Sequence, residues 1–242
     1  MTSSTEGGTA PKSGGLFEDL IEVLYAPSPV FERTRAKKAF LYALVTAVLV
    51  GVIMVGTKNL LQPWLDAQGE LALKAMAKAG RQLPPGSEGS VVANTGWSIV
   101  LGTPLVMLIG PYLNALLILL SAKLTKTAVS FQQAAVIATL AGVPRILGII
   151  AMPAQAAVLD GSSARSISDL SLGAARFVDP ESMPPAIFGL LGSLDITRIW
   201  QIALIGIGVS VVGRVSRGAG MITALIMFGI SAALQLIPSA IF

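Results

Sequence analysis

The chain has 242 residues, of which 53% are hydrophobic and only 12% are charged, and it carries a formal net charge of +4. Soluble domains contain about a quarter charged residues, so this composition indicates a membrane protein. The positive charge does not indicate nucleic acid as a partner, because most basic residues flank apolar segments, where they orient a membrane chain. The chain contains no Cys and no His, which excludes thiol nucleophiles, imidazole bases and most zinc or haem sites. We therefore expect no metal and no cofactor.

The N-terminal region divides into a polar tail and an amphipathic segment. Residues 1–15 are mostly Thr, Ser, Gly and Pro. They are predicted to be a disordered tail without the apolar core of a signal peptide, so we expect the N-terminus to stay in the cytoplasm. Residues 16–38 are predicted to be an amphipathic cytoplasmic segment that either rests on the membrane or the bundle, or docks a partner. The apolar face of its helix consists of Phe17, Leu20, Ile21 and Leu24.

Five apolar segments follow, and each is predicted to cross the membrane as an α-helix. They cover about residues 39–57, 97–121, 131–159, 197–213 and 218–240. A helix needs about 20 residues to cross a hydrocarbon core of roughly 30 Å, and it satisfies its own backbone hydrogen bonds there. The fourth segment is at the short end of this range. The predicted fold class is all-α, a polytopic membrane bundle whose five-span domain extends from residue 39 to residue 242.

The distribution of basic residues predicts the orientation of this bundle. Lys and Arg are dense before the first span and in the two short turns, and sparse in the long segments 57–94 and 160–185. Short basic stretches beside spans stay in the cytoplasm, so we expect a cytoplasmic N-terminus and a C-terminus outside. The basic residues of the flank and turns are Arg33, Arg35, Lys37, Lys38, Lys123, Lys126, Arg214 and Arg217.

Prolines lie inside the second and third spans, which are predicted to be kinked or broken. The second contains Pro104 and Pro111, and the third contains Pro144 near its centre. Arg145 follows Pro144 and is the one formal charge deep in an apolar segment. An arginine at the bilayer centre costs about 2.5–3.5 kcal/mol on insertion scales. Arg145 should therefore face the bundle interior or a wet cavity, or meet a carboxylate or backbone carbonyls.

Two interpretations of Arg145 remain open. It contacts an anion or a lipid headgroup, or it caps the carbonyls that Pro144 leaves without donors. Asp195, at the outer rim of the fourth span, is the candidate acidic partner for Arg145 or for its own neighbour Arg198. Under the first interpretation Arg145→Gln spares folding and abolishes activity. Under the second, Arg145→Glu prevents folding.

The last two spans contain small residues, and the spans lack the acid–base groups of an enzyme. Gly206 and Ser210, with Gly220 and Ala224 on the next span, are small-xxx-small pairs that permit close helix packing. The spans contain no paired carboxylates and the chain no phosphate loop, so no enzyme constellation is present. We expect a protein without catalytic activity.

Four stretches of the chain resemble the Yip-domain proteins, named after Ypt/Rab GTPase-interacting proteins, and especially their bacterial branch. The likeness covers about residues 16–242, and the order and spacing of the stretches carry it. They are Val-Leu-Tyr-Ala-Pro-Ser-Pro-Val-Phe-Glu at 23–32, Ser-Phe-Gln-Gln at 130–133 with Val-Pro-Arg-Ile-Leu at 143–147, Leu-Asp-Ile-Thr-Arg-Ile-Trp at 194–200, and the stretch from Ile207-Gly208 to Ala219. The candidate structural or ligand-contact residues in these stretches are Pro144, Arg145, Asp195, Arg198 and Trp200.

The resemblance implies a five-helix protein with the same orientation and a location in the bacterial cytoplasmic membrane. Eukaryotic members help to organise vesicle membranes with small GTPases. This chain lacks their Asp-Leu-Tyr-Gly-Pro element, which argues against a small GTPase as partner. Some bacterial members accompany ABC-type exporters, so the resemblance implies an accessory role in export.

Two hypotheses of function follow. The first is a non-enzymatic scaffold or accessory protein that contacts other membrane proteins or lipids, with homo-oligomers possible. The second is a small transporter or channel that uses the broken second and third spans around Arg145.

Overall fold

The computed structural model describes the backbone of residues 14–241 and the side chains of residues 14–235. The disordered tail predicted for residues 1–15 therefore lies almost entirely outside the described residues. Within them the secondary structure is helical, apart from one isolated bridge between Gly173 and Asp195, and this confirms the all-α prediction. The α-helices are α1 (Leu16–Glu22), α2 (Pro27–Thr34), α3 (Ala39–Gly56), α4 (Lys58–Lys78), α5 (Glu88–Leu124), α6 (Phe131–Ala141), α7 (Val143–Ala156), α8 (Pro185–Ser193), α9 (Ile196–Val212) and α10 (Arg217–Ile241).

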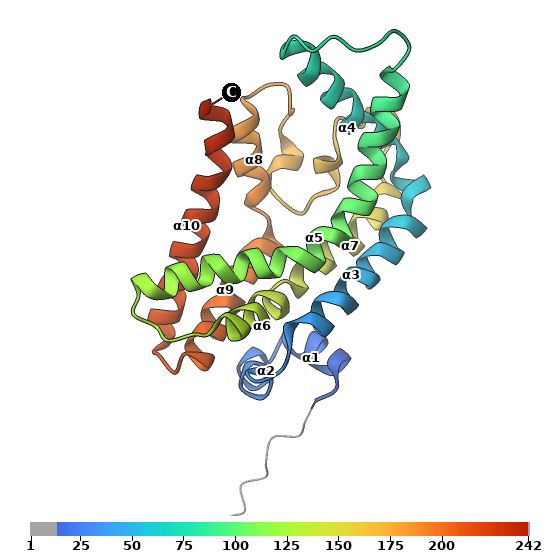
Figure 1. Cartoon of the computed structure of the whole chain (residues 1–242). Helices are drawn as coiled ribbons and strands as arrows, with labels where there is room; N and C mark the ends of the chain where they lie inside the picture. Colours follow the sequence, from blue (N-terminus) through green and yellow to red (C-terminus); the bar gives the residue numbers. More distant parts are fainter. Residues whose placement is uncertain (1–13, 242) are drawn as a thin grey trace, which may run out of the picture.

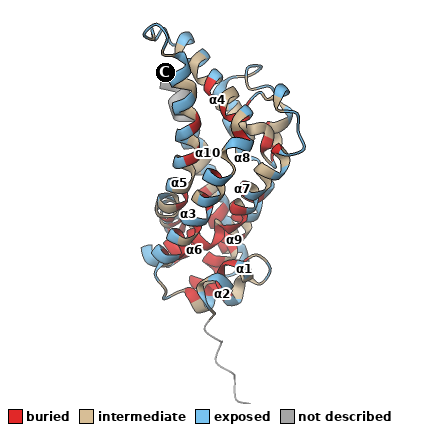
Figure 2. Ribbon diagram, turned by 90° about the vertical axis from the view of Figure 1, so that its right-hand side faces the viewer, coloured by how far each residue is buried: buried red, intermediate tan, exposed pale blue. Residues whose placement is uncertain are grey.

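The helices form an elongated bundle with different elements at its two ends. Figure 1 shows α1 and α2 at one end, together with the turns that join α5 to α6 and α9 to α10. The other end carries α4, α8 and the segment 157–184, which contains three short 3-10 helices. The C-terminus lies at this second end. Figure 2 shows buried residues gathered around α6 and α9, which are the central helices of the bundle.

Four helical stretches are long and apolar enough to cross a membrane. They are Ala39–Gly56, Glu88–Leu124, Phe131–Ala156 and Arg217–Gln235, whereas Ile196–Val212 is apolar but has only 17 residues. Large apolar side chains cover the outward faces of α3 and α5. Such faces suit lipid rather than water as solvent. Examples on these two helices are Leu41, Val48, Val52, Leu101 and Leu113.

The second predicted span is longer than expected and bent. Helix α5 has 37 residues and continues through both Pro104 and Pro111, although the sequence places the span only at 97–121. Figure 1 shows its ribbon changing direction partway along. A proline inside a helix removes one backbone hydrogen bond and clashes with the preceding turn, which bends the helix. The prolines therefore mark a bend and do not end the helix.

The third predicted span is divided into two helices. Helix α6 ends at Ala141, Gly142 caps it, and α7 begins at Val143 with Pro144 in its first turn. Pro144 is well placed there, because the first residues of a helix have no intrahelical partner for their N–H groups. The backbone N–H of Gly142 donates to the carbonyls of Ala138 and Thr139, so the backbone itself closes this junction.

Helices α9 and α10 approach each other through small residues. A Cβ added to Gly220 would clash with the carbonyl oxygen of Gly206, and it would lie 2.8 Å from the Cβ and 2.9 Å from the backbone nitrogen of Ser210. A Cβ on Gly206 would lie 3.1 Å from the Cα of Met221. Three of the four small residues singled out in the sequence thus form a close contact between these helices.

The N-terminal segment contains a second helix beside the amphipathic one that the sequence predicts. Helix α1 ends at Glu22, and Pro27 is the first residue of α2. The predicted apolar face is divided, because Leu20 is buried and Leu24 packs against the core, whereas Phe17 and Ile21 are 69% and 62% exposed. The side of α1 that packs against the bundle also contains Asp19, which is fully buried.

Asp19 is buried because it holds α1, α2 and α3 together. Its carboxylate accepts hydrogen bonds from Arg33 Nε at 2.6 Å and from Lys37 Nζ at 2.8 Å. The hydroxyl of Tyr42 also donates to it. Burial alone raises the pKa of Asp19, but the hydrogen bonds from Lys37, Tyr42 and Arg33 outweigh burial and hold this pKa below its usual value. Asp19 is therefore an ionised anchor at this end of the bundle.

Candidate functional site

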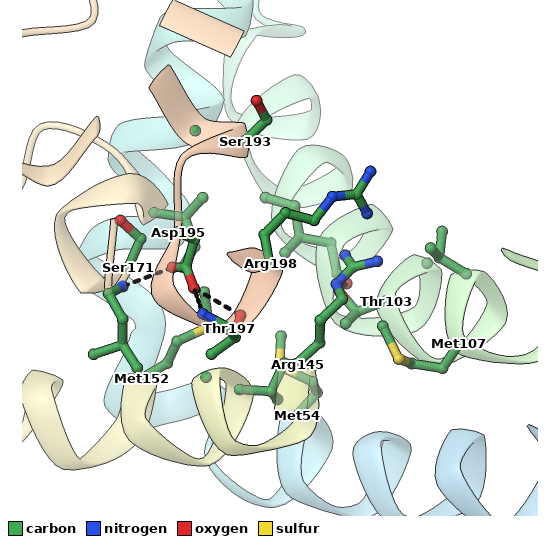
Figure 3. A pocket seen from close by; sticks show the side chains of 18 of the residues that line it. Met54, Thr103, Met107, Arg145, Met152, Ser171, Ser193, Asp195, Thr197 and Arg198 are labelled. Carbon is green, nitrogen blue, oxygen red and sulfur yellow. Dashed lines mark hydrogen bonds between the residues drawn. The ribbon is translucent and has the colours of Figure 1, made fainter. Parts of the chain in front are cut away.

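A cavity of about 730 Å³ lies inside the half of the bundle that carries α4 and α8. Helices α3, α5, α7, α8, α9 and α10 line it, together with the segment between α7 and α8. Its lining is largely apolar and includes Met54, Met107 and Met152. Two arginines, Arg145 and Arg198, are also part of the lining. Figure 3 shows the side chains of both arginines directed to the same side of this cavity.

Arg145 reaches the cavity from the first turn of α7. The break at Gly142 starts a new helix there, and Arg145 is its third residue. Within the described residues its guanidinium has no carboxylate within 4 Å and makes no hydrogen bond to a backbone carbonyl. The carbonyl that the proline leaves without a donor is that of Leu140, four residues before Pro144, and no hydrogen bond from Arg145 reaches it among the described residues. This arrangement favours a guanidinium that faces the cavity over one that caps the helix break.

Arg198 reaches the cavity from the first turn of α9. One guanidinium nitrogen donates to Gln201 Oε1 at 3.0 Å, and the other donates to Ser231 Oγ at 3.3 Å. The guanidinium also lies 5.8 Å from the ring centre of Phe228, a cation–π contact. All three partners are neutral, so none of them cancels the positive charge of Arg198.

Asp195 lines the same cavity, but its carboxylate serves the backbone. One oxygen accepts hydrogen bonds from the backbone N–H of Thr197 at 2.7 Å and from its hydroxyl at 2.6 Å. The other accepts from the backbone N–H of Leu172 at 3.1 Å. Asp195 thereby caps the N-terminus of α9 and fixes the segment before α8 to it. Figure 3 shows it pointing away from the two guanidinium groups.

The structure thus brings together three of the five candidate residues. Arg145, Asp195 and Arg198 line one cavity, whereas Pro144 is buried in the first turn of α7 and Trp200 is 37% exposed on α9. Neither Pro144 nor Trp200 lines the cavity.

Several polar residues of the cavity are missed by sequence reasoning. They are Thr103 from α5, Ser171 from the segment after α7, Ser193 at the end of α8, and Gln235 from α10. Isolated serines, threonines and glutamines are ordinary in membrane helices, so nothing in the sequence marks them.

A cavity with two guanidinium groups and one engaged carboxylate carries an excess of positive charge. Its described lining contains no base that could activate a nucleophile, since Asp195 is the one carboxylate there and is engaged, and the chain has no His. Its chemistry is that of binding an anion between apolar walls.

The fold and this cavity define a helical membrane protein with a cationic pocket among its helices. The family model for the Yip1 domain matches residues 21–237, nearly the whole chain. The chain therefore belongs to the Yip1 domain family, as the resemblance in the sequence indicates, and it is an integral membrane protein in contact with lipids. Searches of curated proteins and of solved structures give no match.

Proposed function

We propose that this protein is a non-enzymatic scaffold or accessory protein of a bacterial cytoplasmic membrane, where it contacts another membrane complex or lipids. The observation that carries the proposal is the match of residues 21–237 to the Yip1 domain. Residues 39–242 form the membrane domain of the proposed protein and cross the membrane five times. Residues 16–38 form its cytoplasmic segment.

The arrangement of the bundle supports a cytoplasmic N-terminus and a C-terminus outside. Helices α1 and α2 and both short basic turns lie at one end, and the C-terminus lies at the other (Figure 1). An odd number of spans is needed for termini at opposite ends. Helix α9 supplies the fifth span: its 17 residues extend about 26 Å at 1.5 Å per residue, the short end of the spanning range.

The backbone of the two basic turns gives independent support. Lys126 and Arg214 follow α5 and α9 with φ values of 54° and 53°, the left-handed conformation that glycine adopts most easily. The next N–H closes each turn, from Thr127 to Ala122 and from Val215 to Ser210. Cationic residues occupy these positions although glycine would be less strained there, which fits a need for positive charge on the cytoplasmic side.

Reporter fusions test the orientation. We expect alkaline phosphatase, which is active only outside the cytoplasm, to be active when it is fused after Phe242 and when it is inserted in the loop 80–87. A fluorescent protein inserted in the turn 125–130 should be fluorescent. Fluorescence of a fluorescent protein fused after Phe242 would contradict five spans with this orientation.

Affinity purification at native abundance tests the scaffold role. We expect the protein, solubilised gently, to be recovered with another membrane complex, and an ABC-type exporter is the partner that the family resemblance favours. Crosslinking before solubilisation would also reveal homo-oligomers. Recovery of the protein alone, with and without crosslinking, would count against a scaffold.

A small transporter or channel is the second candidate, and the cavity around Arg145 favours it. Discontinuous helices that meet at a charged cavity are typical of transporter binding sites, and the break at Gly142 places Arg145 at such a point. This candidate requires anion flux in proteoliposomes that is lost in Arg145→Gln. Equal flux with and without protein would exclude it.

A further inference from the structure

Neither arginine of the cavity forms an ion pair within the described residues, so an anion would stabilise this site. Arg145 and Arg198 line the same cavity from α7 and α9. The one carboxylate that lines it with them, Asp195, accepts three hydrogen bonds from Thr197 and Leu172, and no ion pair joins it to either arginine within the described residues. Two cations in a medium of low dielectric constant are costly unless an anion offsets them.

The geometry selects the kind of anion. Two guanidinium groups that enter one cavity from neighbouring helices match the several oxygens of a phosphate group, which arginine binds through paired N–H donors. Thr103 and Ser193 line the same space, but their hydroxyls donate to the backbone carbonyls of Ile99 and Leu190, so the two arginines are the donors for the anion. A carboxylate would use one of the two forks, whereas a phosphate group has enough oxygens for both.

The size and walls of the cavity select the carrier of that phosphate. A volume of about 730 Å³ lies in the range of sites for whole small molecules and is far larger than an inorganic anion needs. The methionines of the wall are flexible apolar side chains that adapt to an apolar ligand. Gly102 and Gly192 also line the cavity, and a Cβ at either would meet no described atom within 4 Å, so both positions border open space.

We propose that Arg145 and Arg198 bind the headgroup phosphate of an anionic phospholipid, with the glycerol and the first part of the acyl chains in the apolar part of the cavity. The inference rests on the membrane location in the proposed function and adds a ligand to it. The lipid would enter the cavity at the end of the bundle that carries α4 and α8, which the proposed orientation places outside.

Native mass spectrometry of the full chain in detergent, with added phosphatidylglycerol, tests this proposal. We expect the wild type to retain the lipid. The double variant Arg145→Gln/Arg198→Gln should bind it at least about tenfold more weakly, because charge-assisted hydrogen bonds are lost. Arg217→Gln is the matched control, since Arg217 is an exposed arginine at the opposite end. Binding that falls equally in the control would reveal surface attraction and overturn the proposal.

A second variant keeps the test decisive if the double variant does not fold. Gly102→Leu adds a side chain to the cavity wall, where the added Cβ meets no described atom within 4 Å, and it leaves both arginines in place. It should fold and lose the lipid by steric exclusion. Retention of phosphatidylglycerol by Gly102→Leu at wild-type affinity would contradict a headgroup in this cavity.

Competition with inorganic phosphate separates the two sources of the same chemistry. We expect millimolar phosphate to leave phosphatidylglycerol bound, because only the lipid also gains from the apolar walls. Thermal stabilisation by phosphate but not by phosphatidylglycerol would overturn the lipid and assign the site to a soluble anion. The reporter fusions test the membrane topology separately, so a correctly oriented protein that binds no lipid refutes this inference alone.

Discussion

Replacing Asp19 by Asn is expected to lower the free energy of unfolding by about 3 kcal/mol, since removing one partner of a buried ion pair leaves the others uncompensated. Asp19 is fully buried and receives hydrogen bonds from Arg33, Lys37 and Tyr42. Arg33 keeps a second carboxylate partner, Glu22, at 2.6 Å. The substitution therefore removes the ion pair mainly from Lys37. Unfolding of the full chain in detergent, followed by circular dichroism, measures the change.

Glu32→Gln is the control for Asp19→Asn. Glu32 is half exposed and lies 3.5 Å from Arg35, and an exposed pair of this kind contributes less than about 1 kcal/mol. Equal small effects of the two substitutions would show that the buried cluster does not anchor the N-terminal helices.

The same cluster predicts how stability depends on pH. The pKa of Asp19 in the folded protein lies below its usual value, so the unfolded chain binds a proton at this position more readily than the folded chain does. The contribution of Asp19 is therefore fully present above about pH 4, the unfolded pKa, and is lost as the pH falls through the folded pKa. The difference in unfolding free energy between wild type and Asp19→Asn should shrink below about pH 4. A difference that is constant down to pH 3 would contradict this assignment.

Replacing Gly220 by Val is expected to cost about 2–3 kcal/mol, the range for forcing extra atoms into a packed contact. Even the first added carbon would clash with the carbonyl of Gly206 and the backbone of Ser210, and backbone atoms cannot move aside as a flexible side chain can. Helices α9 and α10 would have to separate along their whole contact. A lower midpoint of thermal unfolding in detergent is the expected result.

Gly229→Val on the same helix is the matched control. Gly229 is exposed, and a Cβ there would meet no described atom within 4 Å, so this substitution changes helix propensity and apolar surface without a clash. The difference between the two variants isolates the close approach of α9 and α10. Identical thermal midpoints would mean that the helices tolerate a larger separation.

The N-terminal segment shows the limit of apolar periodicity. Of the predicted face, Leu20 and Leu24 pack against the core, whereas Phe17 and Ile21 are exposed. The protein also buries Asp19, because two cations, Arg33 of α2 and Lys37 of the following turn, and the hydroxyl of Tyr42 in α3 converge on it. Helical periodicity carries no information about partners that lie 14 to 23 residues away.

The cavity also shows that the sequence does not reveal which distant residues meet. An arginine in an apolar segment is visible in the sequence and correctly raises the question of what offsets its charge. The sequence also suggests Asp195 as the answer, yet Asp195 caps α9 and holds Leu172. Which polar groups meet depends on the directions in which α7 and α9 begin, and these follow from the break at Gly142 and from the cap itself.

The sequence by itself determined that lipid surrounds the helices, that the fold is all-α and that the chain belongs to this family. It also identified the small residues between the last two helices. Hydropathy, charge density and residue size allow this because they act locally along the chain. The tertiary structure alone decided that Asp19 is an anchor, that α5 continues through its prolines, and that Arg145 and Arg198 share one cavity in which no described carboxylate forms an ion pair with them. These features depend on contacts between distant residues, where the free energy of an ion pair or a packed contact outweighs the preference of any single segment.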